Sequence, residues 1–210
     1  MNKPTIALLG GGGRTGKFVV ARLLREQYHL KILLRNPQTF DNSHPSIEPV
    51  CGDALDSHCI SKLLQGCAAV ISTIGQRKDE PLVAKRSTDN IIREMEVQGI
   101  RRFIILAGLN IDSPGDQKGA QTLAATDWMK ANFPLIQKDR QSAYAQLSAS
   151  GIDWTLVRVP MIDFSEGTGN LKVSGLDCPG TSVRAGDIAQ FIVEQLDDKQ
   201  YVRQSPFIAN

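Results

Sequence analysis

Short apolar runs alternate along the chain with segments that carry apolar residues at helical spacing. The runs are typical of strands buried on both faces, and the spaced segments are typical of helices with one buried face. We expect strands at residues 6–9, 30–34, 47–50, 68–73, 103–107 and 154–157. We expect helices at residues 14–27, 57–64, 81–98, 120–131, 135–150 and 185–196. Strands that alternate with helices predict an α/β fold with a doubly wound parallel sheet and helices on both faces.

The segments outside these elements add less regular structure. Residues 39–49 form a polar connection with prolines where a second helix would usually lie, and residues 109–119 form a loop. Residues 160–184 are rich in glycine with short strand-like pieces, and a short tail follows the last helix. The expected helix caps are Asp56 at an N-terminus and Gly66, Gly99 and Gly151 at C-termini. A chain of 210 residues that is 41% hydrophobic suits a single domain over residues 1–210.

A glycine-rich loop joins the first expected strand to the first expected helix. Gly10, Gly13 and Gly16 stand at G-x-x-G-x-x-G spacing, one residue wider at the start than the usual dinucleotide fingerprint. Glycine lets backbone approach a ligand closely, and a helix N-terminus offers unpaired amides and a positive dipole end to a phosphate. This context predicts a pyrophosphate site, and the alternative is a structural turn without a ligand.

The residue at the end of the second strand bears on which nucleotide would bind. Ligands of parallel sheets lie at the carboxyl ends of strands, which gathers loops 10–16, 35–36, 53–54, 73–77 and 107–110 into one expected crevice. An NAD site usually carries Asp or Glu at the end of the second strand, but this chain has Arg35 there. A guanidinium can grip the 2′-phosphate of NADP, so we expect NADP(H) as cofactor. The alternative for Arg35 is an exposed strand-end arginine, and Arg14 is a second candidate phosphate partner.

Charge and composition exclude several other classes. The formal net charge is +2 with interspersed charges, which argues against a nucleic-acid surface. No apolar run reaches the roughly 18 residues of a membrane span, so we expect a cytoplasmic protein that acts on a small molecule. The cysteines and histidines are dispersed without metal-ligand spacing, so we expect no metal site and no disulfides. They are Cys51, Cys59, Cys67 and Cys178, with His29, His44 and His58. The sequence does not indicate the oligomeric state.

Seven motifs in order resemble those of one family, the atypical short-chain dehydrogenase/reductases with an NAD(P)H-binding domain. This group includes biliverdin reductase B, which is a flavin reductase, and the NmrA-like proteins. The motifs lie at residues 6–16, 33–36, 52–56, 70–75, 99–103, 150–158 and 184–189. The resemblance implies a Rossmann-type fold with a small C-terminal substrate lobe.

The resemblance also implies positions along the cofactor. Asp53 and Ala54 would lie by the adenine, the segment 73–75 along the middle, and Ala107, Gly108 and Pro160 beside the nicotinamide. With the glycine loop and Arg35, the candidate cofactor-binding set is Gly10, Gly12, Gly13, Arg14, Thr15, Gly16, Arg35, Asp53, Ala54, Thr73, Ile74, Gly75, Ala107, Gly108 and Pro160.

The chain departs from the family at the positions that carry acid–base chemistry. Many relatives have Ser-Ser where this chain has Ala107-Gly108, and Ile136 and Arg140 occupy the register of the family's Tyr-x-x-x-Lys pair. Tyr144 is the only tyrosine on that helix, and we expect it to serve packing. No catalytic residue is therefore assigned.

These departures favour a reaction that needs little side-chain chemistry. We expect an NADPH-dependent reductase that transfers hydride to a flavin-like, quinone-like or other conjugated acceptor, because ring positioning supplies most of that rate. The alternative is a non-catalytic NADP(H)-binding redox sensor of the NmrA type. Arg77, Lys138 and Arg140 could steer an anionic acceptor, but we expect them to be solvated surface residues.

Overall fold

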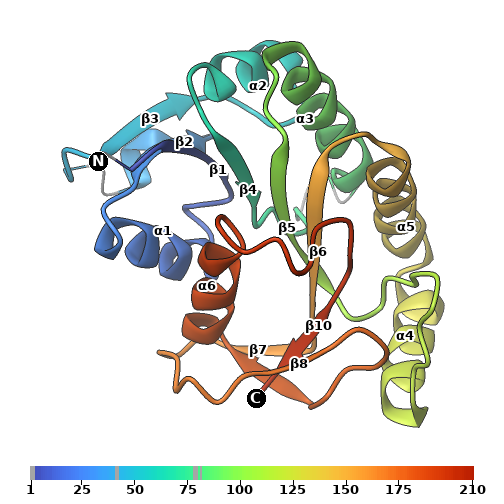
Figure 1. Ribbon diagram of the computed structural model, residues 1–210. Helices are drawn as coiled ribbons and strands as arrows, with labels where there is room; N and C mark the ends of the chain where they lie inside the picture. The colour runs from blue at the N-terminus through green and yellow to red at the C-terminus, as the bar shows by residue number, and fades with distance from the viewer. Residues whose placement is uncertain (1–2, 41–42, 78–79, 81) are drawn as a thin grey trace.

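An eight-stranded, mostly parallel sheet forms the centre of the fold (Figure 1). The computed structural model describes residues 3–40, 43–77, 80 and 82–210. The strand order is β3-β2-β1-β4-β5-β6-β10-β8, and only β8 runs antiparallel to its neighbour. The strands are β1 (Thr5–Leu9), β2 (His29–Leu34), β3 (Ile47–Cys51), β4 (Ala69–Ser72), β5 (Arg102–Gly108), β6 (Asp153–Val159), β8 (Lys172–Ser174) and β10 (Phe207–Ala209).

Helices cover both faces of this sheet. One layer contains α1 (Gly16–Arg25) and α6 (Ala185–Glu194), and the other contains α2 (Ser57–Leu64), α3 (Ala84–Gln98) and α5 (Pro134–Ala149). Side chains alternate along β1, so that Ile6 and Leu8 join the first core while Ala7 and Leu9 join the second. A further helix, α4 (Ala120–Asn132), packs on α5 (Figure 1). The predicted doubly wound Rossmann-type fold is confirmed.

The order of strands reverses beside β1. The chain runs outward from β1 through β2 to β3, then crosses back to β4 on the other side of β1. In the β1–β4 register Leu9 lies opposite Ser72, so both strands end together. The loops after β1 and β4 therefore diverge from one point, which is where ligands of such sheets bind.

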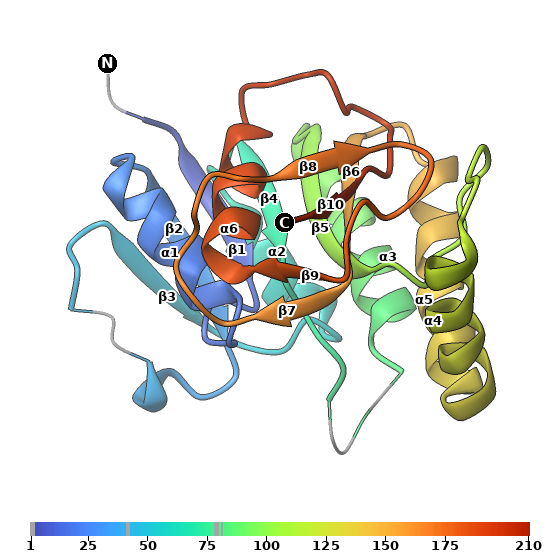
Figure 2. The same cartoon turned by 90° about the horizontal axis from the view of Figure 1, so that it is seen from below.

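The glycine-rich segment 160–184 forms the expected small lobe. It contains β7 (Met161–Asp163) and β9 (Ser182–Arg184), which pair in parallel as a separate two-stranded sheet, seen side by side in Figure 2. In the described part of the connection after β2, residues 35–40 and 43–46, the one helical segment is the short 3₁₀ helix η1 (Pro37–Thr39), in agreement with the predicted polar connection there.

Three of the four predicted helix caps are confirmed. The Asp56 carboxylate accepts a hydrogen bond from the His58 amide at 2.8 Å. Gly66 and Gly99 follow α2 and α3 with φ of 74° and 70°, the left-handed backbone that glycine adopts without a Cβ penalty. The prediction for Gly151 is wrong, because α5 ends at Ala149, the cap residue Ser150 is in extended backbone, and Gly151 is not left-handed.

The residues after α6 also differ from the expected short tail. Phe207–Ala209 is the buried strand β10, which pairs with β6 on one side and β8 on the other. Three apolar residues are too few to show a strand period, and long-range pairing decides their conformation. None of the helices within the described ranges is long and apolar enough to cross a bilayer.

Candidate functional site

The glycine loop after β1 is pressed against the end of β4. Gly10 has a φ of 83°, and a Cβ there would lie 2.7 Å from the Thr73 hydroxyl oxygen and 2.8 Å from its carbonyl carbon. A Cβ on Gly16 would overlap the carbonyl oxygen of Gly10. Both positions therefore require glycine, Gly10 for its backbone conformation and Gly16 for the close approach of α1 to the loop.

Amide groups of this loop remain available to a ligand. The Gly13 amide donates to the Gly10 carbonyl at 2.9 Å, which closes the turn. The amides of Gly12, Arg14 and Thr15 have no acceptor within the described part of the chain, and no side chain caps α1. Unpaired amides at the positive end of a helix dipole favour a bound anion such as a pyrophosphate.

A groove of about 1110 Å³ runs from this loop across the ends of β2, β3 and β4. Its volume is slightly above the roughly 300–1,000 Å³ of typical ligand pockets. Ten residues of the predicted cofactor-binding set line it, namely Gly10, Gly12, Gly13, Arg14, Thr15, Arg35, Ala54, Thr73, Ile74 and Gly75. The structure thus brings most of the predicted set to one surface, which fits a dinucleotide by shape and by its free amide donors.

The predicted residue Asp53 does not line this groove, and its carboxylate is already hydrogen-bonded. Arg77 donates two hydrogen bonds to it, at 2.8 and 2.6 Å, and the Leu55 amide donates a third at 2.9 Å. Burial alone would raise the pKa of the Asp53 carboxyl, but the hydrogen bonds from Arg77 and Leu55 outweigh it and hold the pKa below its usual range. The expectation that Arg77 is solvated is wrong, since its side chain is only 11% exposed.

The Arg35 guanidinium, at the far end of the groove, is available to bind a ligand. Its side chain is exposed beyond β2, and it has no hydrogen bond or ion pair with any residue that the structure describes. With Arg77 paired to Asp53, Arg35 is the cation at this end that can still bind a phosphate.

A second cavity of about 300 Å³ continues from the groove toward β5, α5 and β6. The two share six lining residues: Thr15, Thr73, Ile74, Gly75, Arg140 and Ile162. Three more predicted residues, Ala107, Gly108 and Pro160, line this second cavity together with apolar side chains such as Ile105 and Leu156. The predicted residue Gly16 lines neither space, and its place is in the close packing of α1 on the loop. The predicted nicotinamide end is therefore a small, mostly apolar chamber at one end of the groove.

Tyr144 lines the chamber but its hydroxyl is already paired. The hydroxyl lies 2.7 Å from the Ser113 hydroxyl, which in turn receives a hydrogen bond from Ser205 at 2.8 Å. The ring meets Trp154 edge to face, with centroids 6.0 Å apart. These contacts agree with the packing role that the sequence predicts for Tyr144.

The charged groups of the groove and chamber are all cations. Among the described residues that line either space there is no carboxylate, histidine or cysteine, and the charged side chains are Arg14, Lys17, Arg35, Arg77 and Arg140. No group of three histidine, cysteine or acidic side chains able to hold a metal occurs within the described ranges. The site therefore suits an anionic ligand and lacks the phenol–lysine pair of acid–base redox.

Arg140, like Arg77, was expected at the solvated surface and lies elsewhere. It is half-buried on α5 and lines both spaces. Burial lowers the pKa of its guanidinium below the usual range. Lys138, for which the same solvated position was expected, is exposed as predicted.

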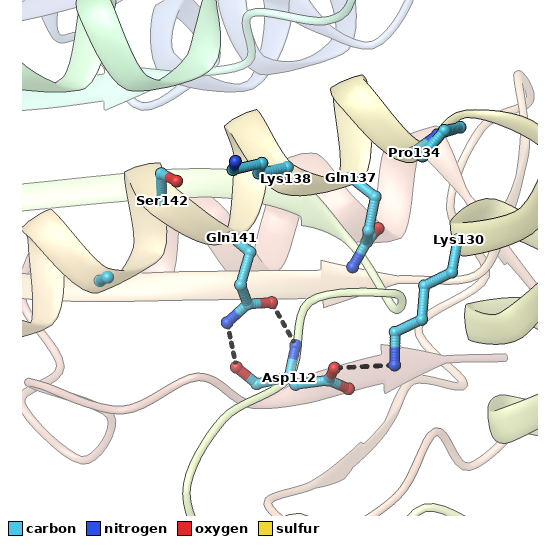
Figure 3. A pocket seen from close by; sticks show the side chains of 8 residues that line it. Asp112, Lys130, Pro134, Gln137, Lys138, Gln141 and Ser142 are labelled. Carbon is cyan, nitrogen blue, oxygen red and sulfur yellow. Dashed lines mark hydrogen bonds and ion pairs between the residues drawn. The ribbon is translucent and has the colours of Figure 1, made fainter.

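A third hollow, of about 420 Å³, lies between α4 and α5, away from the glycine loop (Figure 3). Asp112 and Gln141 exchange two backbone–side-chain hydrogen bonds, at 2.8 and 3.0 Å, and Lys130 pairs with the Asp112 carboxylate at 3.2 Å. These groups satisfy one another, so they leave few donors or acceptors aimed at a ligand.

Known proteins share both sequence and fold with this chain. Cinnamoyl-CoA reductase 1 of Oryza sativa subsp. japonica is 26% identical over 113 residues, which is 49% of this chain and 33% of that reductase. The match therefore spans about a third of the length of that protein.

Solved structures match over nearly the whole length. The oxidoreductase ylbE of Lactococcus lactis superimposes with a TM-score of 0.82 at 20% identity, covering 98% of this chain and 90% of that one. ChuY, an anaerobillin reductase of Escherichia coli O157:H7, gives 0.81 at 20% identity, covering 98% and 96%. A short-chain dehydrogenase/reductase of Veillonella parvula, solved in complex with NADP, gives 0.79 at 17% identity, covering 100% and 95%. At such identities the likeness shows the shared fold.

The family is shown by a match of the sequence itself. A family model described as NAD(P)H-binding matches residues 10–199, from the first glycine of the loop to beyond α6. The matched range includes the ends of β2, β3 and β4, across which the groove runs. The chain therefore belongs to the NAD(P)H-binding family.

Proposed function

We propose that this protein is an NADPH-dependent reductase that transfers hydride to a flavin-like, quinone-like or other conjugated acceptor. The observation that carries the proposal is the continuity between the anion-binding groove and the apolar chamber, through the lining residues that they share. A dinucleotide with its phosphates on the loop amides can reach the chamber with its nicotinamide. The acceptor ring would then stack against it in surroundings that exclude water.

Each part of the site would hold one part of the cofactor. The amides of Gly12, Arg14 and Thr15 would bind the pyrophosphate, and Arg35 would bind the 2′-phosphate of the adenosine. Ala107, Gly108 and Pro160 would contact the nicotinamide. Bound NADPH would supply the hydride. The chain's own residues would position the two rings, and solvent would deliver the proton.

Turnover with a panel of acceptors tests the proposal. The protein is mixed with NADPH and FMN, riboflavin or 1,4-naphthoquinone, and the absorbance of the reduced nicotinamide is followed. We expect NADPH to be consumed with at least one of them. Tight NADPH binding without consumption across the panel would contradict the reductase. It would favour a redox sensor of the NmrA type, which the absence of a phenol–lysine pair at the chamber also fits.

Replacing Arg35 with aspartate tests the preference for NADPH. A charged hydrogen bond contributes about 1.5–3 kcal/mol, so we expect Arg35→Asp to raise the Kd for NADPH by roughly ten- to a hundredfold. The Kd for NADH is expected to change much less, because NADH has no 2′-phosphate. Isothermal titration calorimetry measures both constants. Arg93→Asp, on the exposed side of α3, makes the same charge change as a control, and equal changes for the two nucleotides would refute the assignment.

A further inference from the structure

The Arg140 guanidinium lies at the junction of the groove and the apolar chamber, where the Asp139 carboxylate favours its charge but forms no ion pair with it. It lines both spaces, and its Nη1 atom lies 3.9 Å from the position of a Cβ on Gly108. It has no hydrogen bond or ion pair with any of the residues in the described ranges. The neighbouring Asp139 carboxylate is engaged by α3, where it accepts from the amides of Ala84 at 2.8 Å and Lys85 at 3.3 Å.

Two other arginines withdrawn from solvent are held by several hydrogen bonds each. Arg158 forms a bidentate ion pair with Asp116, and Arg102 donates to the Gln195 and Asp153 carbonyls and the Thr155 hydroxyl. Burying a cation costs free energy that partners usually offset. Arg140 lacks such hydrogen bonds to the described residues, and its location in a ligand cavity indicates that the partner is a ligand.

The anion that Arg140 would bind belongs at the chamber end of the site. The free loop amides and Arg35 can account for the phosphates of the cofactor. These residues line the groove, and of them only Thr15 also lines the chamber. Arg140 instead stands beside Gly108, at the predicted nicotinamide end. The rest of the chamber lining is apolar or uncharged, so no carboxylate among the described residues there competes for the guanidinium.

We infer that Arg140 binds a carboxylate or phosphate of the acceptor, so that the substrates of this enzyme are anionic conjugated compounds. A guanidinium presents a planar fork of donors that matches both anions in a bidentate manner. The inference rests on the proposed reductase function, because only a reductase has an acceptor. The binding of the anion itself is independent of turnover.

Equilibrium binding of matched probes tests this inference. FMN and riboflavin share one ring system and differ by a phosphate, and 1,4-naphthoquinone-2-sulfonate and 1,4-naphthoquinone differ by a sulfonate. Each probe is titrated into protein saturated with NADP⁺, and binding is followed by flavin fluorescence or by calorimetry. We expect the wild type to bind the anionic member of at least one pair roughly ten- to a hundredfold more tightly.

Two variants on the same helix locate the effect. Arg140→Gln is expected to remove the preference for the anionic probe and to leave the Kd for NADPH within about twofold. Lys138→Gln removes the same charge from an exposed position and is expected to keep the preference. Because Arg140 has no partner within the described chain, its removal leaves no orphaned group, and the thermal midpoint is expected to stay the same. Arg140→Lys, which keeps the charge but not the fork, is expected to restore part of the preference.

The outcomes separate this inference from the proposed function. Equal binding of both members in both pairs, or no binding of any probe, would overturn the role of Arg140 in acceptor recognition. Weaker NADPH binding by Arg140→Gln with an unchanged preference would assign Arg140 to the cofactor and would also overturn it. A preference that depends on Arg140 without consumption of NADPH would support the inference while contradicting the reductase.

Discussion

Gly16→Val is expected to abolish NADPH binding and to lower the free energy of unfolding by about 3 kcal/mol. The added Cβ would overlap the Gly10 carbonyl oxygen and would lie 2.8 Å from both the Gly10 carbonyl carbon and the Gly11 Cα. The loop is held against the end of β4, because the Thr73 amide donates to the Leu9 carbonyl at 2.9 Å and Gly10 leaves no room for a Cβ beside Thr73. Overpacking of this kind typically costs about 1–3 kcal/mol, and contacts with backbone lie at the upper end of that range.

Calorimetry with NADPH and urea denaturation measure the two effects of Gly16→Val. Gly151→Ala provides the control, since a Cβ there meets nothing within 4 Å and its backbone is not left-handed. We expect that control to bind NADPH like the wild type. If Gly16→Val retained NADPH affinity within a few fold, the pyrophosphate would not lie on the loop that precedes α1.

The second large effect is expected at the buried ion pair of Arg158 and Asp116. The Arg158 side chain is 0% exposed. Its guanidinium donates to the two Asp116 carboxylate oxygens at 2.7 and 2.8 Å and to the Ser205 and Ile111 carbonyls, and it lies 3.5 Å from the centroid of the Phe207 ring. Asp116→Asn would leave the guanidinium buried without its counter-charge, which is expected to cost about 3–5 kcal/mol of unfolding free energy.

Urea denaturation of three variants separates this cause from a general loss of charge. Glu48→Gln breaks the pair of the exposed Glu48 carboxylate with the half-buried Lys31 and is expected to cost less than about 1 kcal/mol. The double variant Asp116→Leu with Arg158→Met replaces the pair by apolar groups and is expected to be more stable than Asp116→Asn alone. A loss for Asp116→Asn no larger than that for Glu48→Gln would show that the pair is solvated in solution.

The glycine loop and the alternation of elements were predictable because both are local. Gly10 and Gly16 are required by backbone geometry within one turn, and each strand shows its burial in its own apolar run. The groove followed from these features, because parallel strands end at the same edge of a sheet. The roles of the residues that line it stay predictions.

The features that the sequence did not reveal depend on distant partners. Arg140 and Lys138 are two positions apart on one helix, and only the packing of α5 against the sheet distinguishes a half-buried guanidinium from an exposed ammonium. The expected sixth strand, residues 154–157, stops before Arg158. The observed strand β6 continues to Val159 because Asp116, 42 positions earlier, neutralises that arginine.

The position of β10 has a consequence for biosynthesis. Ribosomes make β10 after every other described strand, yet it lies between β6 and β8 and is the strand that holds β8 to the sheet. Until Phe207–Ala209 emerge, the nascent polypeptide has an open β6 edge, and Arg158 lacks the Ser205 carbonyl and the Phe207 ring. Folding of the sheet is therefore expected to finish only after translation of these residues, and nascent chains that stop earlier would be substrates for chaperones.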